Sequence, residues 1–231
     1  MPRSKKLNDY PRPNVAVDLA VLSVVDDALC VRVLRDDDGW AALPGRFIRE
    51  GSAVAQTVDE VLDLKLGLSG VDVEPHLLAV FSEPGRDPRG WTISIAHSVA
   101  LPSAVLAPAR GEWVEVDASG GLGSLHLRYD HDRIVAAAVA EMRARYEDRP
   151  DPDGLQRQPF TLSELRATHE VVLGRKLMRD TFNRRIEPLL TVATADDGRP
   201  VTRIGGGRPA RLFRLPPSSP SFGWRLPGAG D

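Results

Sequence analysis

The sequence of 231 residues has very little cysteine and no long apolar run. Its single cysteine, Cys30, excludes a disulfide within the chain and a zinc site built from several cysteines. No stretch approaches the roughly 18 consecutive apolar residues that a membrane-spanning helix needs. Met1–Pro13 is basic and rich in proline, and it lacks the apolar segment of a secretory signal. We therefore expect a cytoplasmic protein without a membrane partner.

The charges are distributed unevenly, although their sum is only -2. Residues 1–154 hold 17 Lys and Arg against 25 Asp and Glu, whereas residues 155–215 hold 12 against 6. A hydrophobic content of 42% is typical of a folded globular chain and excludes a wholly disordered one. Two segments of opposite sign predict two domains, of which the basic one suits a polyanion.

Residues 1–150 are expected to form the first domain. Two apolar, β-branched runs within Val15–Leu34 meet at Asp26-Asp27, which predicts a hairpin. Apolar residues recur at spacings of three and four in Ala53–Leu66, which predicts a helix that Gly67 ends. The remaining elements predicted for this domain are strands at Leu77–Phe81, Thr92–Leu101 and Trp113–Val116 and a helix at Ile134–Tyr146.

Residues 160–215 have the pattern of a winged helix. Thr161-Leu-Ser-Glu164 is a capping box that opens one helix, and Gly174 ends it. A second helix lies in Arg179–Leu190 with Phe182 inward, and Pro188 ends or kinks it. Two short strands then flank a loop from Asp196 to Pro209 that contains Gly205-Gly-Gly207.

Proline, glycine and charge mark the two boundaries of this second domain. They gather in Asp148–Gly154, and we place a linker at residues 151–159. Residues 216–231 are rich in proline, serine and glycine, so we expect a disordered tail.

The first domain resembles the Nudix hydrolases through Leu43-Pro-Gly45 and a helix that ends in Gly67-Leu68. Their box, G-x5-E-x7-R-E-U-x-E-E-x-G-U with U aliphatic, then covers residues 46–68. Only Leu62, Gly67 and Leu68 match it. Three positions that carry metal-binding carboxylates in that family hold Val61, Leu64 and Lys65 here. Because Mg²⁺ and Mn²⁺ need oxygen ligands, we expect no metal and no hydrolysis.

A shifted metal site of Asp59, Glu60 and Asp63 is the alternative. A slip of one residue would turn the helix by about 100° and carry its apolar face out of the core. A solvated acidic face is therefore the favoured interpretation of these residues.

The turn Arg86-Asp-Pro-Arg-Gly90 is a candidate nucleotide-binding element. Its two arginines, Arg86 and Arg89, suit a diphosphate, because a guanidinium meets phosphate with two hydrogen bonds. Arg46 and Arg49 add cations from the box loop, and Trp40 or Phe47 offers a ring to a base. The alternative is an ordinary solvated turn, and the residues alone leave both open.

The second domain carries candidate DNA-binding residues on its second helix and its wing. Arg184 lies opposite Phe182 on a helical projection, which places it outward, where arginine can pair with guanine in the major groove. The full candidate set is Lys176, Arg179, Thr181, Asn183, Arg184, Arg185, Arg203 and Arg208. Lys176 and Arg179 suit phosphates, and the last two bracket the triple glycine of the wing. The alternative is a solvated helix face, but charge, helix and wing together favour double-stranded DNA.

This combination of domains resembles the NrtR family of Nudix-related transcriptional regulators. The resemblance covers about Tyr10 to Leu215 and rests on Trp40–Phe47, Arg86–Gly90 and Phe160–Leu165 followed by Leu173–Leu177. It implies an α+β protein, with an N-terminal Nudix-like α/β/α sandwich around a mixed sheet and a C-terminal winged helix-turn-helix domain. It also implies a homodimeric repressor of NAD-metabolism genes that ADP-ribose or a related nucleotide releases from its operator.

Two other functions remain open from the residues. One is an active Nudix hydrolase of ADP-ribose with a basic appendage. The other is a nucleotide-sensing module that does not bind DNA.

Overall fold

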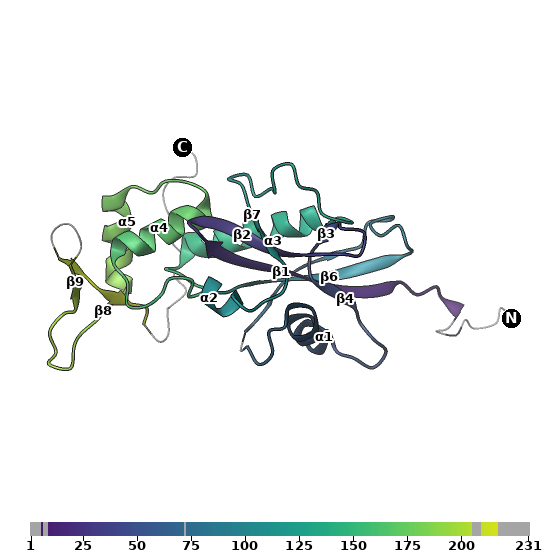
Figure 1. The fold of residues 1–231 in the computed structure, drawn as a ribbon, viewed down its shortest axis with the longest axis horizontal. Helices are drawn as coiled ribbons and strands as arrows, with labels where there is room; N and C mark the ends of the chain where they lie inside the picture. Colours follow the sequence, from purple (N-terminus) through teal and green to yellow (C-terminus); the bar gives the residue numbers. More distant parts are fainter. Residues whose placement is uncertain (1–5, 7–8, 72, 205–208, 217–231) are drawn as a thin grey trace.

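The computed structural model describes residues 6, 9–71, 73–204 and 209–216. Its elements are arranged along one long axis, with the winged-helix residues at one end (Figure 1). In chain order they are β1 Asn14–Val25, β2 Ala28–Arg35, β3 Ala41–Ala42, β4 Gly45–Phe47, α1 Val54–Glu60, η2 Val61–Leu66, β5 His76–Phe81, β6 Thr92–Ala100, α2 Ser103–Leu106, β7 Glu112–Glu115, α3 His131–Asp148, α4 Leu162–Leu173, α5 Arg179–Ile186, η3 Glu187–Leu189, β8 Thr191–Val192, β9 Thr202–Arg203, β10 Ala210–Arg211 and β11 Phe213–Arg214.

A mixed sheet forms the centre of the first domain. Its strand order is β3-β2-β1-β6-β5, with β4 added to β1 and β7 to β2. The predicted hairpin is confirmed, since β1 and β2 pair antiparallel around Asp26 and Asp27. Both turn residues have positive φ, 46° and 61°, as a two-residue hairpin turn requires. β1 and β6 run parallel to each other, whereas the other pairs in the sheet are antiparallel.

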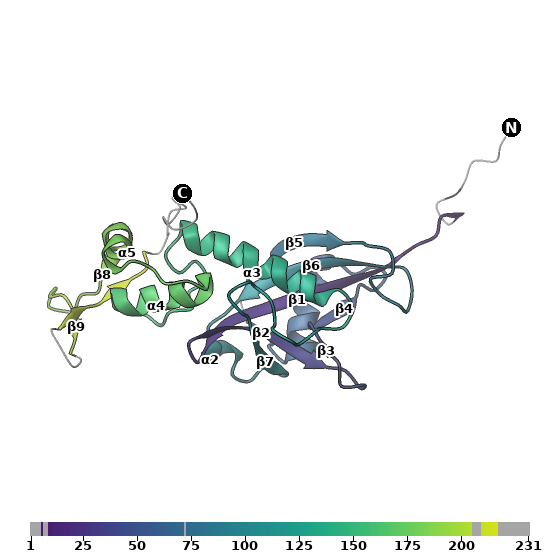
Figure 2. The ribbon, with the colours of Figure 1, turned by 90° about the horizontal axis from the view of Figure 1, so that it is seen from above.

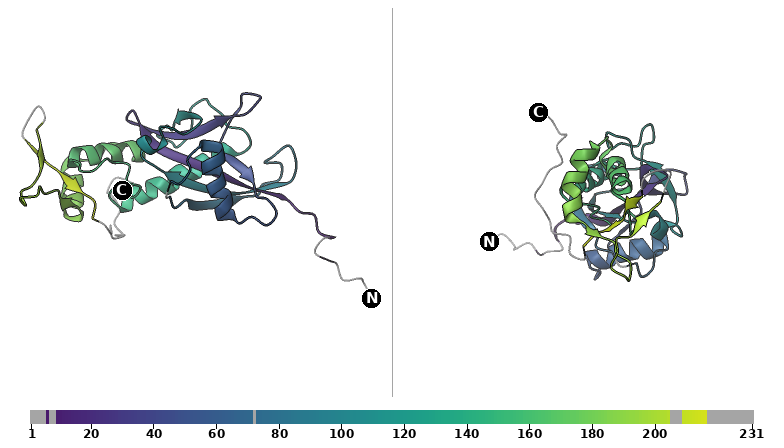
Figure 3. Two further views of the ribbon diagram at one scale, coloured as in Figure 1. Left: turned by 60° about the horizontal axis from the view of Figure 1, so that its bottom comes forward. Right: turned by 90° about the vertical axis from the view of Figure 1, so that its left-hand side faces the viewer.

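Helices cover both faces of this sheet (Figure 3). Leu19 and Val21 of β1 pack with the buried residues of η2 and α2, whereas Ala20 and Leu22 belong to the core beneath α3. This alternation follows from the period of two along a strand. Because β1 is covered on both faces, eight consecutive residues of its twelve are buried. The predicted sandwich with a mixed sheet is confirmed.

The helix predicted for Ala53–Leu66 changes type midway. Val54–Glu60 is α-helical, but Val61–Leu66 forms a π-helix. Gly67 ends it with a left-handed φ of 75°, as the sequence predicts. Apolar residues spaced by three and four fit both an α-helix and a π-helix, so the change of helix type was not predicted from the sequence.

The winged helix forms around α4 and α5 (Figure 2). The capping box is present: Thr161 Oγ1 accepts from Glu164 N–H at 3.2 Å, and Thr161 N–H donates to Glu164 Oε2 at 2.8 Å. α5 ends at Ile186, and Pro188 lies in the short η3 that follows. One expectation was wrong, because the loop predicted from Asp196 to Pro209 contains β9, which pairs with β10.

The segment between the two domains is packed rather than free. Asp151 is only 1% exposed, and its backbone N–H donates to His169 Nε2 of α4 at 3.1 Å. The placement of the linker at residues 151–159 stays a prediction.

Arg208, the triple glycine and residues 217–231 of the predicted tail lie outside the described residues. None of the helices that the structure describes is long and apolar enough to cross a bilayer.

Candidate functional site

A cavity of about 430 Å³ opens on the first domain, within the size range of small-ligand sites. Strands β1 and β4, the turn at residues 86–90 and the start of α3 contribute to its walls. Its lining residues are Ala16, Asp18, Leu34, Arg35, Asp36, Ala42, Leu43, Gly45, Arg46, Phe47, Lys65, Arg86, Asp87, Arg89, Thr92, Tyr129 and His131. Four of the six residues predicted to bind a ligand, Arg46, Phe47, Arg86 and Arg89, are therefore brought together.

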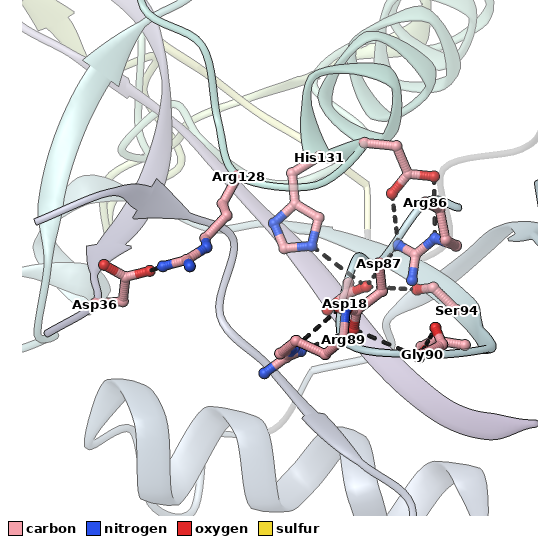
Figure 4. A network of polar contacts seen from close by, with 11 residues as sticks. Asp18, Asp36, Arg86, Asp87, Arg89, Gly90, Ser94, Arg128 and His131 are labelled. Carbon is pink, nitrogen blue, oxygen red and sulfur yellow. Dashed lines mark hydrogen bonds and ion pairs between the residues drawn. The ribbon is translucent and has the colours of Figure 1, made fainter. Parts of the chain in front are cut away.

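Arg86 is a buried ion-pair partner in this wall (Figure 4). Its guanidinium donates to both carboxylate oxygens of Asp130, at 2.6 and 3.0 Å, and to Asp18 Oδ2 at 3.4 Å. Burial would lower the pKa of Arg86, but the hydrogen bonds and charge of Asp130, together with Asp18, hold that pKa above its ordinary value. The Arg86 side chain is 4% exposed, so its charge is committed to these two carboxylates.

Asp18 ties the sheet to the first turn of α3. Its Oδ2 accepts from Ser94 Oγ at 2.6 Å and lies 3.5 Å from His131 Nε2. Leu43 N–H donates to His131 Nδ1 at 2.9 Å, so the ring carries its proton on the nitrogen that faces Asp18. Burial would raise the pKa of Asp18, but the hydrogen bond from His131, together with that from Ser94 and the charge of Arg86, lowers it.

Arg89 lies at the open side of the same cavity. Its guanidinium pairs with Asp87 through two hydrogen bonds of 3.0 and 2.9 Å, yet its side chain remains 59% exposed. The guanidinium carbon is 4.9 Å from the ring centroid of Tyr129 and 5.6 Å from that of Phe47. An exposed cation beside two rings suits an anion that carries a base or a sugar. The two arginines of the turn, equivalent in sequence, thus differ in accessibility.

The box region adds further cations to the cavity. Lys65 lines it, and Arg46 pairs with Glu60 at 2.9 Å. Val61 is fully buried in the core, and Leu64 is exposed. In the alternative metal site of Asp59, Glu60 and Asp63, the Glu60 carboxylate is paired with Arg46, and the Asp63 carboxylate accepts a hydrogen bond from Ser69 Oγ.

Two residues predicted to bind a ligand lie elsewhere. Trp40 lines a separate cavity with Ser124, Leu125 and His126, and Arg49 is exposed and does not line the first cavity. Sequence reasoning also missed Asp18, Tyr129, Asp130 and His131. A signal for Asp18 existed, since a lone carboxylate inside the apolar run of β1 is costly without a partner.

The candidate DNA-binding residues lie mainly on and beside α5. Arg179 and Arg184 are exposed, whereas Phe182, on the opposite side from Arg184, is buried. Thr181, Asn183 and Arg185 are half-buried on the flanks. Lys176 is exposed, with its Nζ 3.1 Å from Glu170 Oε2. Arg203 pairs with Glu164 and donates to the Pro159 carbonyl at 3.1 Å, which ties the wing to the start of α4.

Comparisons with known proteins find relatives of both halves of the chain. Residues 155–215 match the model of the NrtR DNA-binding winged helix domain. The chain is 28% identical over 222 residues to an ADPR responsive transcriptional repressor, NtrR, of Acinetobacter baylyi, covering 90% of this chain and 84% of the relative. It is 32% identical over 132 residues to an ADP-ribose pyrophosphatase of Methanocaldococcus jannaschii, covering 57% of this chain and 76% of that protein.

The fold is similar to that of a solved regulator. The structure of Shewanella oneidensis NrtR complexed with a 27mer DNA matches with a TM-score of 0.69 and 26% identity. The match covers 90% of this chain and 96% of that chain, so both domains are included. The sequence resemblance to regulators of this kind is thereby confirmed.

Proposed function

Because this chain belongs to the NrtR family of Nudix-related transcriptional regulators, we propose that it is a repressor that releases operator DNA when ADP-ribose binds its first domain. The observation that carries the proposal is the match of residues 155–215 to a DNA-binding winged helix behind a domain with a cationic cavity. Similarity over nine-tenths of the chain to an ADPR responsive repressor supports a single function for both halves.

The cavity fits a nucleoside diphosphate sugar. Lys65 and the exposed guanidinium of Arg89 are the cations proposed to face the diphosphate, with Arg46 beside them. Phe47 and Tyr129 offer their rings to the base or to the ribose next to Arg89. Arg86 acts through Asp130 and Asp18 and shapes the wall.

Helix α5 is the proposed DNA-reading element. Arg184 points away from the buried Phe182 and is placed to reach a base edge in the major groove, as recognition helices do. Lys176 and Arg179, near the start of α5, are proposed to hold phosphates, with Arg203 in the wing. Two copies in a homodimer would meet two half-sites, and a change in their spacing would lower affinity.

Hydrolysis of ADP-ribose is the second candidate function, favoured by the 32% identity to a pyrophosphatase. The residues present do not fit the divalent metal that such hydrolysis uses. Val61 and Leu64 offer no oxygen ligand, and Lys65 places a cation at the cavity. We therefore propose that the domain binds its nucleotide without turning it over and without a metal cofactor.

Purified protein incubated with ADP-ribose and either Mg²⁺ or Mn²⁺ is expected to form no AMP, because Val61, Leu64 and Lys65 stand where Nudix hydrolases carry metal-binding carboxylates. Chromatography of the reaction measures this, with an active ADP-ribose pyrophosphatase as the positive control. Turnover near ~1 s⁻¹, which lies within the ordinary enzyme range, would contradict the expectation.

The regulator function is tested by fluorescence anisotropy with a labelled duplex from the region upstream of the gene. We expect salt-dependent binding that ADP-ribose weakens and that AMP at the same concentration does not. Protein that binds ADP-ribose but shows no affinity for this DNA at low salt would favour the nucleotide-sensing module instead.

A further inference from the structure

Helix α3 links the cavity to the winged helix (Figure 2). Its first residue, His131, lines the cavity, and Asp130 immediately before it is held by Arg86. Its 18 residues contain no proline or glycine and span about 27 Å at 1.5 Å per residue. A continuous helix of this kind moves as one body, so a displacement at its first turn reaches its last turn.

The last turn of α3 meets the winged helix through a buried cluster. Tyr146 donates its hydroxyl to Asp151 Oδ1 at 3.0 Å, and its ring centroid is 5.0 Å from that of His169 on α4. The His169 ring is in turn 5.3 Å from Phe182 on α5. All four side chains are buried, with at most 1% of any residue exposed. We call Tyr146, Asp151, His169 and Phe182 the aromatic joint.

The aromatic joint is not fully satisfied in this arrangement. Burial lowers the pKa of His169 to about 3, so the ring is neutral at pH 7. Because Asp151 N–H donates to its Nε2, its own proton lies on Nδ1, which has the Tyr146 backbone as a weak partner and no other hydrogen-bond partner among the described residues. Asp151 also has a left-handed φ of 44°, which a residue other than glycine rarely adopts.

Such a cluster is suited to two arrangements of similar stability. A buried network with one weakly paired donor gains from any rearrangement that gives the donor a better partner. A strained backbone position persists only while its surroundings hold it. A small displacement of α3 therefore changes the balance at the joint.

We propose that the aromatic joint transmits occupancy of the cavity to α5, so that a nucleotide held beside His131 changes how Phe182 seats the DNA-reading helix. This inference rests on the proposed function and names the path of its regulation. Tyr146 and His169 are positioning residues in this path, since they touch neither the nucleotide nor the DNA. The ligand acts at Asp18, Arg86 and Asp130, which fix the start of α3 to the sheet.

The test is the ratio of DNA affinities measured without and with saturating ADP-ribose. In the full-length wild-type protein we expect a ratio of about 5 to 150, the usual range of coupling between two sites. Tyr146→Phe keeps the ring and removes the hydroxyl that binds Asp151, and it should bring the ratio to within about twofold of one. Direct titration calorimetry should give an ADP-ribose affinity within about twofold of wild type, because Tyr146 does not line the cavity.

His169→Gln is the second variant, because it removes the weakly paired ring nitrogen at the centre of the joint. Glu147→Gln is the matched control: Glu147 lies next to Tyr146 on α3 and pairs with Arg175 at 3.4 Å, outside the joint. It should keep the wild-type ratio. A purely structural role for the joint would lower the melting temperature and leave the ratio unchanged.

The outcomes separate the two claims. If Tyr146→Phe and His169→Gln both fold and keep the wild-type ratio, the joint does not carry the signal and the inference is overturned, although the regulator function stands. If the wild-type protein itself shows a ratio of one, the proposed function fails, and the inference fails with it.

Discussion

Replacing Arg86 with alanine is expected to lower the free energy of unfolding by about 3–5 kcal/mol, the usual cost of breaking a buried ion pair. The substitution leaves Asp18 and Asp130, whose side chains are 9% and 10% exposed, without their shared cation. Chemical denaturation followed by circular dichroism measures the loss. The double variant Arg86→Ala/Asp130→Asn should recover part of it, because one uncompensated charge is removed together with its partner.

Arg89→Ala is the matched control within the same turn. Its side chain is largely exposed, and Asp87 keeps a hydrogen bond from the backbone N–H of residue 89 at 3.0 Å, so we expect a smaller loss of stability than for Arg86→Ala. ADP-ribose affinity should instead fall by about 1.5–3 kcal/mol, the range of a hydrogen bond to a charged group. Equal effects of the two substitutions on both stability and affinity would show that the turn acts as one unit and refute this division of roles.

Replacing Arg184 with alanine should weaken binding to the operator by about 1–3 kcal/mol and relax the sequence preference at the base it meets. Arg184 is exposed on the face of α5 opposite the buried Phe182, so the fold should be unaffected. Fluorescence anisotropy on the operator and on single-base variants of it measures both effects.

Arg133→Ala is the control for Arg184, because it removes the same charge from the exposed first turn of α3, in the other domain. Its effect on DNA affinity should stay within about 0.5 kcal/mol. If Arg184→Ala matches Arg133→Ala at every sequence tested, α5 does not read bases.

The fold was largely predictable because its local signals are strong. Asp26-Asp27 specifies the hairpin, and Thr161 with Glu164 specifies the start of α4. The parallel pairing of β1 with β6 was not predictable, because it joins residues 78 positions apart, with no local signature. The winding of η2 was missed because a spacing of three and four fits both kinds of helix, and β9 was missed because it is only two residues long.

The candidate site was only partly predictable. Arg86 and Arg89 look equivalent in the sequence, and only the fold shows that Asp130 and Asp18 bury the first while the second faces outward. Trp40 and Phe47 were equal candidates for stacking, but only Phe47 lines the cavity. The sequence identifies arginines and aromatic residues that could bind a ligand. Whether such a side chain is accessible depends on its contacts with residues from distant segments, which the sequence does not show.

In the proposed mechanism one chain binds both ADP-ribose and DNA, and each ligand weakens the binding of the other. The most direct measurement is titration calorimetry of ADP-ribose into full-length protein, free and saturated with its operator. Because coupling between two ligands is reciprocal, DNA must weaken ADP-ribose binding by the same factor by which ADP-ribose weakens DNA binding. We expect these two factors to agree and to exceed about five. An ADP-ribose affinity that is identical with and without DNA would contradict this mechanism.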